Sequence, residues 1–223
     1  MDLTIAALRQ FSLLQAFSDD ELEQIRARLS FRSLSANEVL IIEGAASDPL
    51  YFVLEGWFKA EKVSREGRQQ TLRFVGPGEV LNELSVFSND PSAVTVIAME
   101  AGMVFSISRS DVEKWLSQSQ SFSRVVVREL AKRMGHLLNH IENLSLYPVE
   151  VRLARFLLEE ADRGVMERQA WKTQTEIANQ LGTVLDVVNR QLQKFAREGI
   201  IDLGRDQIKV IDQKRLEEIA RGG

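Results

Sequence analysis

The sequence predicts an α+β protein with an N-terminal antiparallel β-roll (jelly-roll-like), a long dimerisation helix and a C-terminal winged helix-turn-helix domain. Short β-rich runs alternate with glycine turns between Phe31 and Ser108, which is typical of a roll of antiparallel strands. A helical pattern with a heptad repeat follows as far as Leu146. Residues 175–195, TEIANQLGTVLDVVNRQLQKF, place two helical pieces around one glycine. The predicted domains are 1–109 for the roll, 110–147 for the dimerisation helix region and 148–223 for the winged helix-turn-helix domain.

Composition excludes several classes of protein. The chain has 223 residues, enough for two modest domains with separate cores. It contains no cysteine, which rules out disulfides, thiolate metal sites and cysteine nucleophiles and suits a reducing compartment. The start, MDLTIAALRQ, lacks the apolar core of a secretory signal, and no window approaches 18 apolar residues. We therefore expect a cytoplasmic protein without membrane contact.

The region before the long helix opens with a helix signal and continues as strands. Ser18-Asp19-Asp20-Glu21 is a capping-box sequence that leads into an apolar helical pattern. The β-rich runs are VLIIEG, LYFVLEGWFKAEKV, QTLRFVGPGEVL and SAVTVIAMEAGMVFSIS. Glycines separate these runs, as expected for turns between short strands.

The later part of the helical region carries a heptad repeat. Apolar residues recur at positions a and d, and leucine at d with a β-branched or flexible residue at a favours a parallel two-stranded coiled coil. The alternative is a helix packed against its own domain. We predict a dimer seam formed by Val127, Leu130, Met134, Leu137, Ile141 and Leu144.

Residues 175–195 have the spacing of a helix-turn-helix. Ala178 is small where a second helix crosses closely, and Gly182 stands where the turn needs a positive φ. Val188 and Leu192 pack inward from the second helix, although Gln191 stands where an apolar contact is usual. The following IIDLGRDQIKVI predicts two strands around a turn that contains Gly204, which makes the domain a winged one.

The outward face of the second helix has the chemistry of a DNA reader. Asp186 and Arg190 are four residues apart and share a face. Arginine can bond guanine, aspartate can accept from cytosine N4, and asparagine, here Asn189, can pair with adenine. The net charge of −4 argues weakly against nucleic acid, but from Val149 onward 13 basic residues balance 13 acidic ones. The alternative is a solvated face with a surface Asp–Arg pair. We predict contacts to double-stranded DNA from Thr173, Thr175, Leu185, Asp186, Asn189, Arg190 and Lys194.

Together these pieces resemble the Crp–Fnr family of bacterial transcription regulators. The resemblance lies in LYFVLEGWFKAEKVSREGRQQTLRFVGPGEVLNELSVF, IENLSLYPVEVRLARFLL and TQTEIANQLGTVLDVVNRQLQKFAREGII. It implies a cyclic-nucleotide-binding-like sensor in 1–109, a homodimer, palindromic promoter sites and RNA polymerase as a further partner. The family's reading face matches Asp186, Val188, Asn189 and Arg190. Leu185 departs from the pattern, because many relatives place an arginine there.

The resemblance also implies an effector pocket, whose residues in this chain differ from those of family members that bind cyclic AMP. Members that bind cyclic AMP use a Gly-Glu-Leu stretch and an Arg-Ser pair, and the matching positions here are Asn82-Glu83-Leu84, Ser92 and Ala93. The sequence therefore predicts that no guanidinium remains to neutralise a phosphate, a contact worth about 1.5–3 kcal/mol. On the long helix Arg133 is retained, while Leu137 and Leu138 replace the hydroxyls that touch adenine. We expect an apolar pocket that is not built for cyclic AMP.

The cofactor and the protein class leave alternatives open. Haem is one candidate, because His136 and His140 form an i,i+4 pair on the long helix and imidazole is a good iron ligand. A small organic ligand or no ligand is the other. No sequence pattern supports an enzyme, since GPGEV lacks the lysine of a phosphate loop and the two histidines fit no persuasive triad. A protein-interaction module that does not bind DNA is the second alternative.

Overall fold

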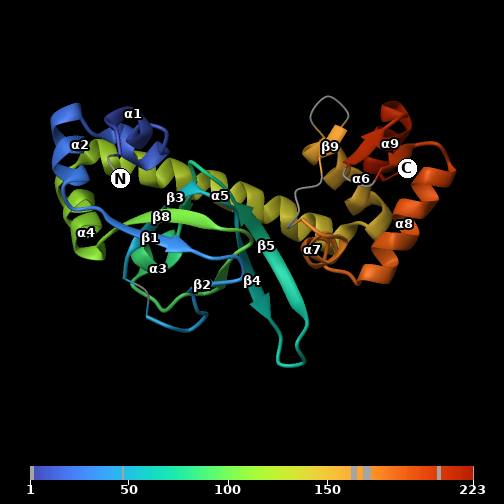
Figure 1. The fold of residues 1–223 in the computed structure, drawn as a ribbon, viewed down its shortest axis with the longest axis horizontal. Helices are drawn as coiled ribbons and strands as arrows, with labels where there is room; N and C mark the ends of the chain where they lie inside the picture. The colour runs from blue at the N-terminus through green and yellow to red at the C-terminus, as the bar shows by residue number, and fades with distance from the viewer. Residues whose placement is uncertain (1–2, 47, 162–164, 168–171, 205–206, 223) are drawn as a thin grey trace. The chain divides into compact units, whose positions relative to one another are not determined.

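The computed structural model describes residues 3–46, 48–161, 165–167, 172–204 and 207–222 (Figure 1). The chain forms two compact units. The first comprises Met1–Arg68 and Leu72–Gly135, and the second comprises Gln69–Thr71 and His136–Gly223.

Short helices open the first unit. They are α1 (Ile5–Leu8), the 3-10 helix η1 (Ser12–Ala16) and α2 (Asp19–Arg26). The predicted capping box is confirmed: the Ser18 hydroxyl accepts from the Glu21 amide, and the Glu21 carboxylate accepts from the Ser18 amide at 2.7 Å. These bonds satisfy donors that would otherwise lack partners at the start of α2.

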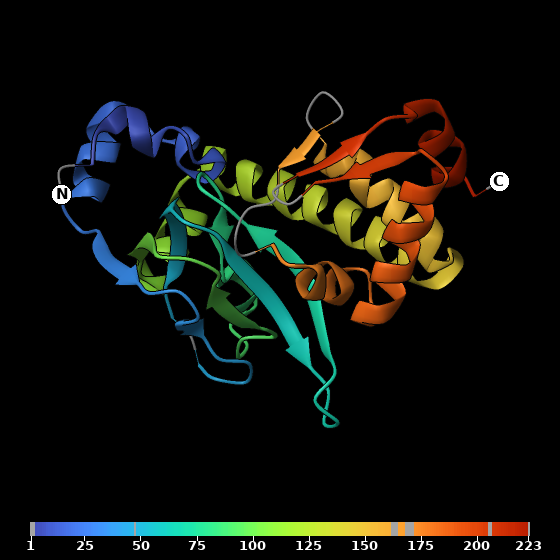
Figure 2. The same cartoon turned by 45° about the vertical axis from the view of Figure 1, so that its right-hand side comes forward.

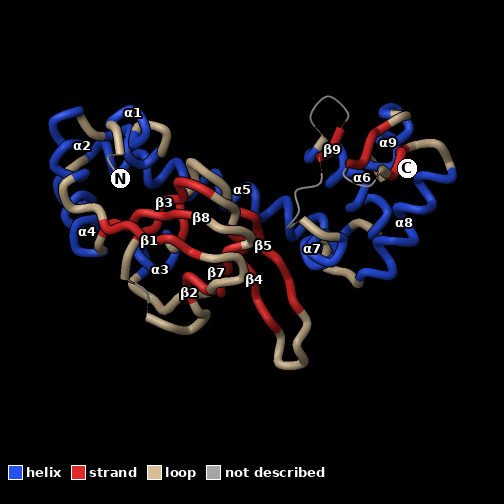
Figure 3. Tube along the Cα trace, in the orientation of Figure 1, coloured by secondary structure: helices blue, strands red, loops and turns tan. Residues whose placement is uncertain are grey.

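Two four-stranded sheets make the predicted roll, which Figure 3 shows as red segments. The order in one sheet is β1-β8-β3-β6 and in the other β2-β7-β4-β5. The strands are β1 (Ser30–Leu34), β2 (Val39–Ile41), β3 (Leu50–Glu55), β4 (Phe58–Val63), β5 (Gln69–Val75), β6 (Val80–Leu81), β7 (Thr95–Ala98) and β8 (Gly102–Ile107). Sequence neighbours such as β7 and β8 lie in different sheets, so the chain crosses repeatedly between the two layers.

Aromatic packing ties the N-terminal helices to the first sheet. The rings of Phe52 and Phe105 stack with centroids 4.7 Å apart, and Phe11 meets both edge-on at 5.3 and 5.2 Å. All three side chains are almost fully buried. A fully buried phenylalanine contributes about 1.5–3 kcal/mol, so this trio is a main anchor of the unit.

A short helix that the sequence analysis did not predict lies between the strands. It is α3 (Glu83–Ser88), and it follows Asn82, whose φ is +72°. Asparagine tolerates this left-handed conformation better than most residues. The turn allows Glu83 to enter the interior at the first position of α3.

The predicted helical region is two helices. They are α4 (Arg109–Gln118) and α5 (Gln120–Leu146). Ser119 is extended, with φ −117° and ψ 104°, and its hydroxyl accepts from the Phe122 amide at 3.2 Å. Serine favours such a capping role over a helix interior, which explains the break.

The second unit contains the helix-turn-helix and a small sheet (Figure 2). Its elements are α6 (Val149–Glu160), β9 (Val165–Glu167), α7 (Gln174–Gln180), α8 (Leu185–Arg197), β10 (Ile201–Leu203), β11 (Gln207–Val210) and α9 (Gln213–Ala220). The two predicted strands are present as β10 and β11, and residues 205–206 of their turn lie outside the described residues. The sheet order is β10-β11-β9, so Val165–Glu167 add a third strand that the sequence does not predict.

None of the helices in the described part of the chain combines the length and the apolar run that a bilayer span needs.

Candidate nucleic-acid interface and effector site

Buried apolar residues hold α7 against α8. Val188, Leu192 and Phe195 are almost fully buried on the inner face of α8, and Ala178 is buried on α7. Gly182 between the helices has φ +63°. These positions confirm the packing that the helix-turn-helix spacing predicts, and they fix which face of α8 points outward.

The outward face of α8 carries the predicted reading residues. Leu185, Asp186 and Arg190 are exposed, while Asn189 is half-buried. Asp186 lies in the first turn, where an acidic side chain also interacts favourably with the helix dipole. The Oδ1 atom of Asn189 is shielded from solvent and has no hydrogen-bond partner among the described residues. Because this oxygen is shielded, the Asn189 side chain has to turn outward before it can accept from the N6 amino group of adenine.

The start of α8 breaks a local rule of helix capping. Its N-cap is Val184, which offers no side-chain acceptor to the first-turn amides. Val184 is also 61 % exposed, beside Leu185 at 37 %. An exposed apolar pair with uncapped amides behind it lowers stability, and local violations of this kind tend to occur at functional sites.

The predicted phosphate-contacting residues differ in their availability. Thr173 caps α7, because its hydroxyl oxygen accepts from the Glu176 amide at 3.3 Å, and Thr175 is exposed. Lys194 forms an ion pair with Glu150 at 2.7 Å, which raises the pKa of the lysine. Arg197 is exposed at the end of α8 and bonds the Gln193 carbonyl.

The side chains of the predicted dimer seam are mostly exposed to solvent in this single chain. Val127 and Met134 are each 66 % exposed, and Leu130, Leu137 and Ile141 are exposed too, while Leu144 is half-buried. A stripe of apolar side chains along a helix is seldom left to water without a partner.

A buried ion pair occupies the predicted effector position of the first unit. The Glu83 side chain is only 7 % exposed, and its carboxylate pairs with the guanidinium of Arg133 from α5. Arg133 also donates to the carbonyl oxygen of Val80, in β6, at 3.3 Å. The structure thus brings together two of the predicted effector residues, one from the roll and one from the long helix.

Arg73 is a third member that the sequence analysis missed. It comes from β5 and donates to the same Val80 oxygen at 2.6 Å. The prediction that no guanidinium neutralises a phosphate concerns Ser92 and Ala93 and stays a prediction, while Arg73 adds a second guanidinium near Glu83. The signal in the sequence is an arginine within the apolar run LRFV, but only the fold shows that β5 carries it to β6. We call Arg73, Glu83 and Arg133, with the Val80 oxygen, the charge cluster.

Burial and charge act in opposite directions in the charge cluster. Burial raises the pKa of the Glu83 carboxyl, and the nearby guanidiniums of Arg133 and Arg73 lower it in part. Burial also lowers the pKa of Arg73, which Glu83 partly restores and Arg133 lowers further. Guanidinium groups stay protonated in proteins, so the cluster holds two cations against one buried carboxyl.

The other predicted effector residues are placed differently. The Asn82 amide donates to the Pro49 carbonyl at 2.9 Å, and the Ser92 hydroxyl donates to the Val94 carbonyl at 2.8 Å. Leu84 is 64 % exposed and Ala93 is half-buried. Leu137 and Leu138 are exposed and belong to the second unit. Asn82 and Ser92 therefore serve the loops around α3 through these bonds.

The two histidines differ in their surroundings. His136 is exposed, whereas burial and the charge of Arg152 lower the pKa of His140. A guanidinium beside an imidazole opposes the binding of a metal cation at that ring. Among the described residues, no group of three or more His, Asp or Glu side chains could hold a metal ion.

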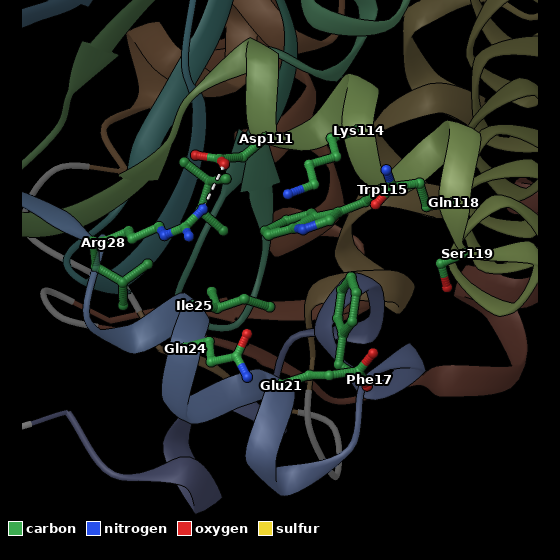
Figure 4. A pocket seen from close by; sticks show the side chains of 12 residues that line it. Phe17, Glu21, Gln24, Ile25, Arg28, Asp111, Lys114, Trp115, Gln118 and Ser119 are labelled. Carbon is green, nitrogen blue, oxygen red and sulfur yellow. Dashed lines mark hydrogen bonds and ion pairs between the residues drawn. The ribbon is translucent and has the colours of Figure 1, made fainter.

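A surface cleft of about 200 Å³ lies between α2 and α4 (Figure 4). Ile25 and Trp115 form apolar parts of its lining, and the Arg28–Asp111 ion pair spans it at 3.2 Å. Glu21, on its rim, is engaged in the Ser18 capping box. The acids of this cleft already have partners, so it offers no charge arrangement comparable to the cluster.

Comparison with known proteins assigns both regions. Residues 31–119 match the cyclic nucleotide-binding domain family, and residues 151–219 match the Crp-like helix-turn-helix domain family. A relative from Mycobacterium tuberculosis, named a CRP-like cAMP-activated global transcriptional regulator, is 30 % identical over 185 residues, which are 80 % of this chain and 83 % of the relative. The transcriptional regulator SdrP of Thermus thermophilus is 28 % identical over 204 residues, 88 % of this chain and 96 % of SdrP.

Solved structures agree with this assignment. The structure of FixK2 from Bradyrhizobium japonicum is similar with a TM-score of 0.75 and 25 % identity, covering 86 % of this chain and 96 % of FixK2. A CooA mutant from Carboxydothermus hydrogenoformans shares the fold with a TM-score of 0.76, over 98 % of this chain and 97 % of that one. The relatives are transcription regulators and not enzymes. The chain belongs to the Crp–Fnr family of transcription regulators.

Proposed function

We propose that the protein is a homodimeric, sequence-specific DNA-binding regulator that acts in the cytoplasm. The observation that carries the proposal is the outward face of α8, where Leu185, Asp186 and Arg190 are exposed beside the half-buried Asn189. Base-reading chemistry on the second helix of a helix-turn-helix suits the major groove. RNA polymerase is the further partner that the family resemblance implies.

The exposed seam on α5 supports the homodimer. Two copies that pair through this stripe would each present one α8. In helix-turn-helix dimers the two recognition helices enter major grooves about 34 Å apart and read two half-sites one helical turn apart. An inverted-repeat operator follows from the twofold symmetry of such a dimer.

The effector part of the proposal is a ligand other than cyclic AMP, or none. The M. tuberculosis relative is named as cAMP-activated, but Ser92 and Ala93 stand here where the family resemblance places an Arg-Ser pair. The carboxylate of Glu83, which would bond a ribose hydroxyl, is already paired with Arg133. The Ser92 hydroxyl is likewise bonded within its own loop.

Affinity selection from random-sequence duplexes tests the DNA-binding part. Enrichment of an inverted repeat is expected, with an affinity that falls steeply as salt rises because phosphate contacts release counterions. The absence of any enriched sequence at low salt would instead support a module that does not bind DNA. Mass spectrometry and an absorption spectrum of the purified protein test for a bound ligand or haem.

A further inference from the structure

The charge cluster has an excess of positive charge that the described residues do not balance. Arg133 pairs with Glu83, whereas Arg73 forms no ion pair within the described part of the chain. Glu79 is near enough to act on Arg73 electrostatically, but it is exposed and its carboxylate accepts from the Gly76 amide at 2.8 Å. One buried carboxyl therefore faces two guanidiniums.

Hydrogen bonding in the cluster is also incomplete. A carbonyl oxygen has two lone pairs, and both guanidiniums donate to the Val80 oxygen, at 2.6 and 3.3 Å. Each guanidinium carries five N–H donors. Among the described residues, the Val80 oxygen is the one hydrogen-bond acceptor that Arg73 reaches. Its remaining N–H donors have no acceptor among the described residues.

We propose that a small oxyanion binds between Arg73 and Arg133 in the charge cluster. A phosphate or carboxylate group has the planar oxygen pairs that match a guanidinium fork, and a site with partial burial strengthens such charge-assisted bonds. An anion there would also compete with Glu83 for Arg133 and so change the link between the roll and α5. This role as effector rests on the proposed function, whereas the binding site itself does not.

Thermal unfolding with added anions tests the site without DNA. Inorganic phosphate, acetate and cyclic AMP are each titrated at constant ionic strength set with sodium chloride. A ligand that binds only the native state raises the Tm with the logarithm of its concentration above the Kd. We expect such a rise with phosphate or acetate, and the stronger of the two identifies the chemical group.

Variants locate the site. Arg73→Gln should lower the affinity for the anion by about ten-fold or more, because it removes a charge-assisted bond. Arg128→Gln removes the same charge from an exposed position on α5 and should leave the anion affinity unchanged. If Arg73→Gln does not fold, Arg73→Lys decides the question. Lysine keeps the positive charge but lacks the two parallel N–H donors of a guanidinium, so the affinity for the anion should fall several-fold. An unchanged affinity would contradict the proposal.

The outcomes separate this proposal from the proposed function. Equal Tm shifts in the wild type and in Arg73→Gln would mean a general salt effect. That result would overturn the proposed site, and so would the absence of any shift. A much larger, Arg73-dependent shift with cyclic AMP would support the site and overturn the exclusion of that effector. Neither result touches DNA binding, which the duplex selection measures independently.

Discussion

At the scale of single residues, Arg190 is the side chain with the most specific predicted base contact. It is exposed on the outer face of α8 and can bond guanine through O6 and N7. Arg190→Ala should weaken operator binding by about 1–3 kcal/mol and relax the preference at one base pair. Arg197→Ala is the matched control, because Arg197 is exposed at the end of α8 and a loss of its charge should weaken binding to all sequences alike. An equal loss on every sequence in Arg190→Ala would remove its reading role.

Leu185 should read a methyl group and not a polar base edge. Its exposed apolar side chain at the start of α8 can contact the C5-methyl of thymine in the major groove. Replacing that thymine by uracil removes one methyl, worth about 0.8 kcal/mol or roughly four-fold in affinity. The effect should vanish in Leu185→Ala. If no thymine in the operator shows this dependence on Leu185, the residue does not contact the base.

Glu83 should make stability depend on pH in a defined direction. Burial raises the pKa of the Glu83 carboxyl in the folded protein above the ordinary 4.5. At a pH between the ordinary pKa and the raised pKa, the folded state therefore binds more protons than the unfolded state. The contribution of Glu83 is therefore present at low pH and declines as pH rises from about 4.5 through the raised pKa. The difference in unfolding free energy between wild type and Glu83→Gln should show this decline. A difference that grows with pH would mean that the pair with Arg133 outweighs burial.

At the scale of elements, α8 is destabilised at its first turn. Valine is a poor N-cap, and Ser at this position typically adds about 1 kcal/mol. Val184→Ser should slow hydrogen exchange of the α8 amides accordingly. Thr173→Ala removes the working cap of α7 and should speed exchange there by a similar amount. Faster exchange in α8 of Val184→Ser would show that Val184 stabilises the turn by packing.

Most elements could be predicted because their signals are local. The capping box at Ser18, the positive φ of Gly182 and the buried Val188 all depend on residues within a few positions. Helix α3 could not be predicted, because its six residues are too few to show the apolar periodicity of a helix. Strand β9 lies in a polar segment and exists by pairing with β11.

The candidate site was predictable to a different degree in its two parts. The proposed reading face of α8 follows from helical spacing alone, so its exposed residues could be predicted from the sequence. The charge cluster joins β5, β6, α3 and α5, and no spacing rule connects Arg73 with Arg133, 60 positions away. Such a cluster depends on tertiary structure, which explains why one of its cations was missed.

At the scale of the whole molecule, the proposed function depends on two copies pairing through α5. Leu137→Glu would place a charge at the centre of the seam in both copies, and each lost leucine contact is worth about 1.5–3 kcal/mol. The variant should sediment as a monomer at micromolar concentration. Leu146→Glu is the control, because Leu146 is equally apolar and exposed but lies off the heptad. A Leu137→Glu protein that remains dimeric would place the interface elsewhere.

The spacing of half-sites shows whether paired chains hold two α8 helices one helical turn of DNA apart. The measurement is the Kd for the selected operator, compared with the same operator carrying five extra base pairs between its half-sites. Five pairs turn the second half-site to the opposite face of the duplex, so binding should fall to the level of a single half-site. Equal affinity for the two duplexes would contradict the account.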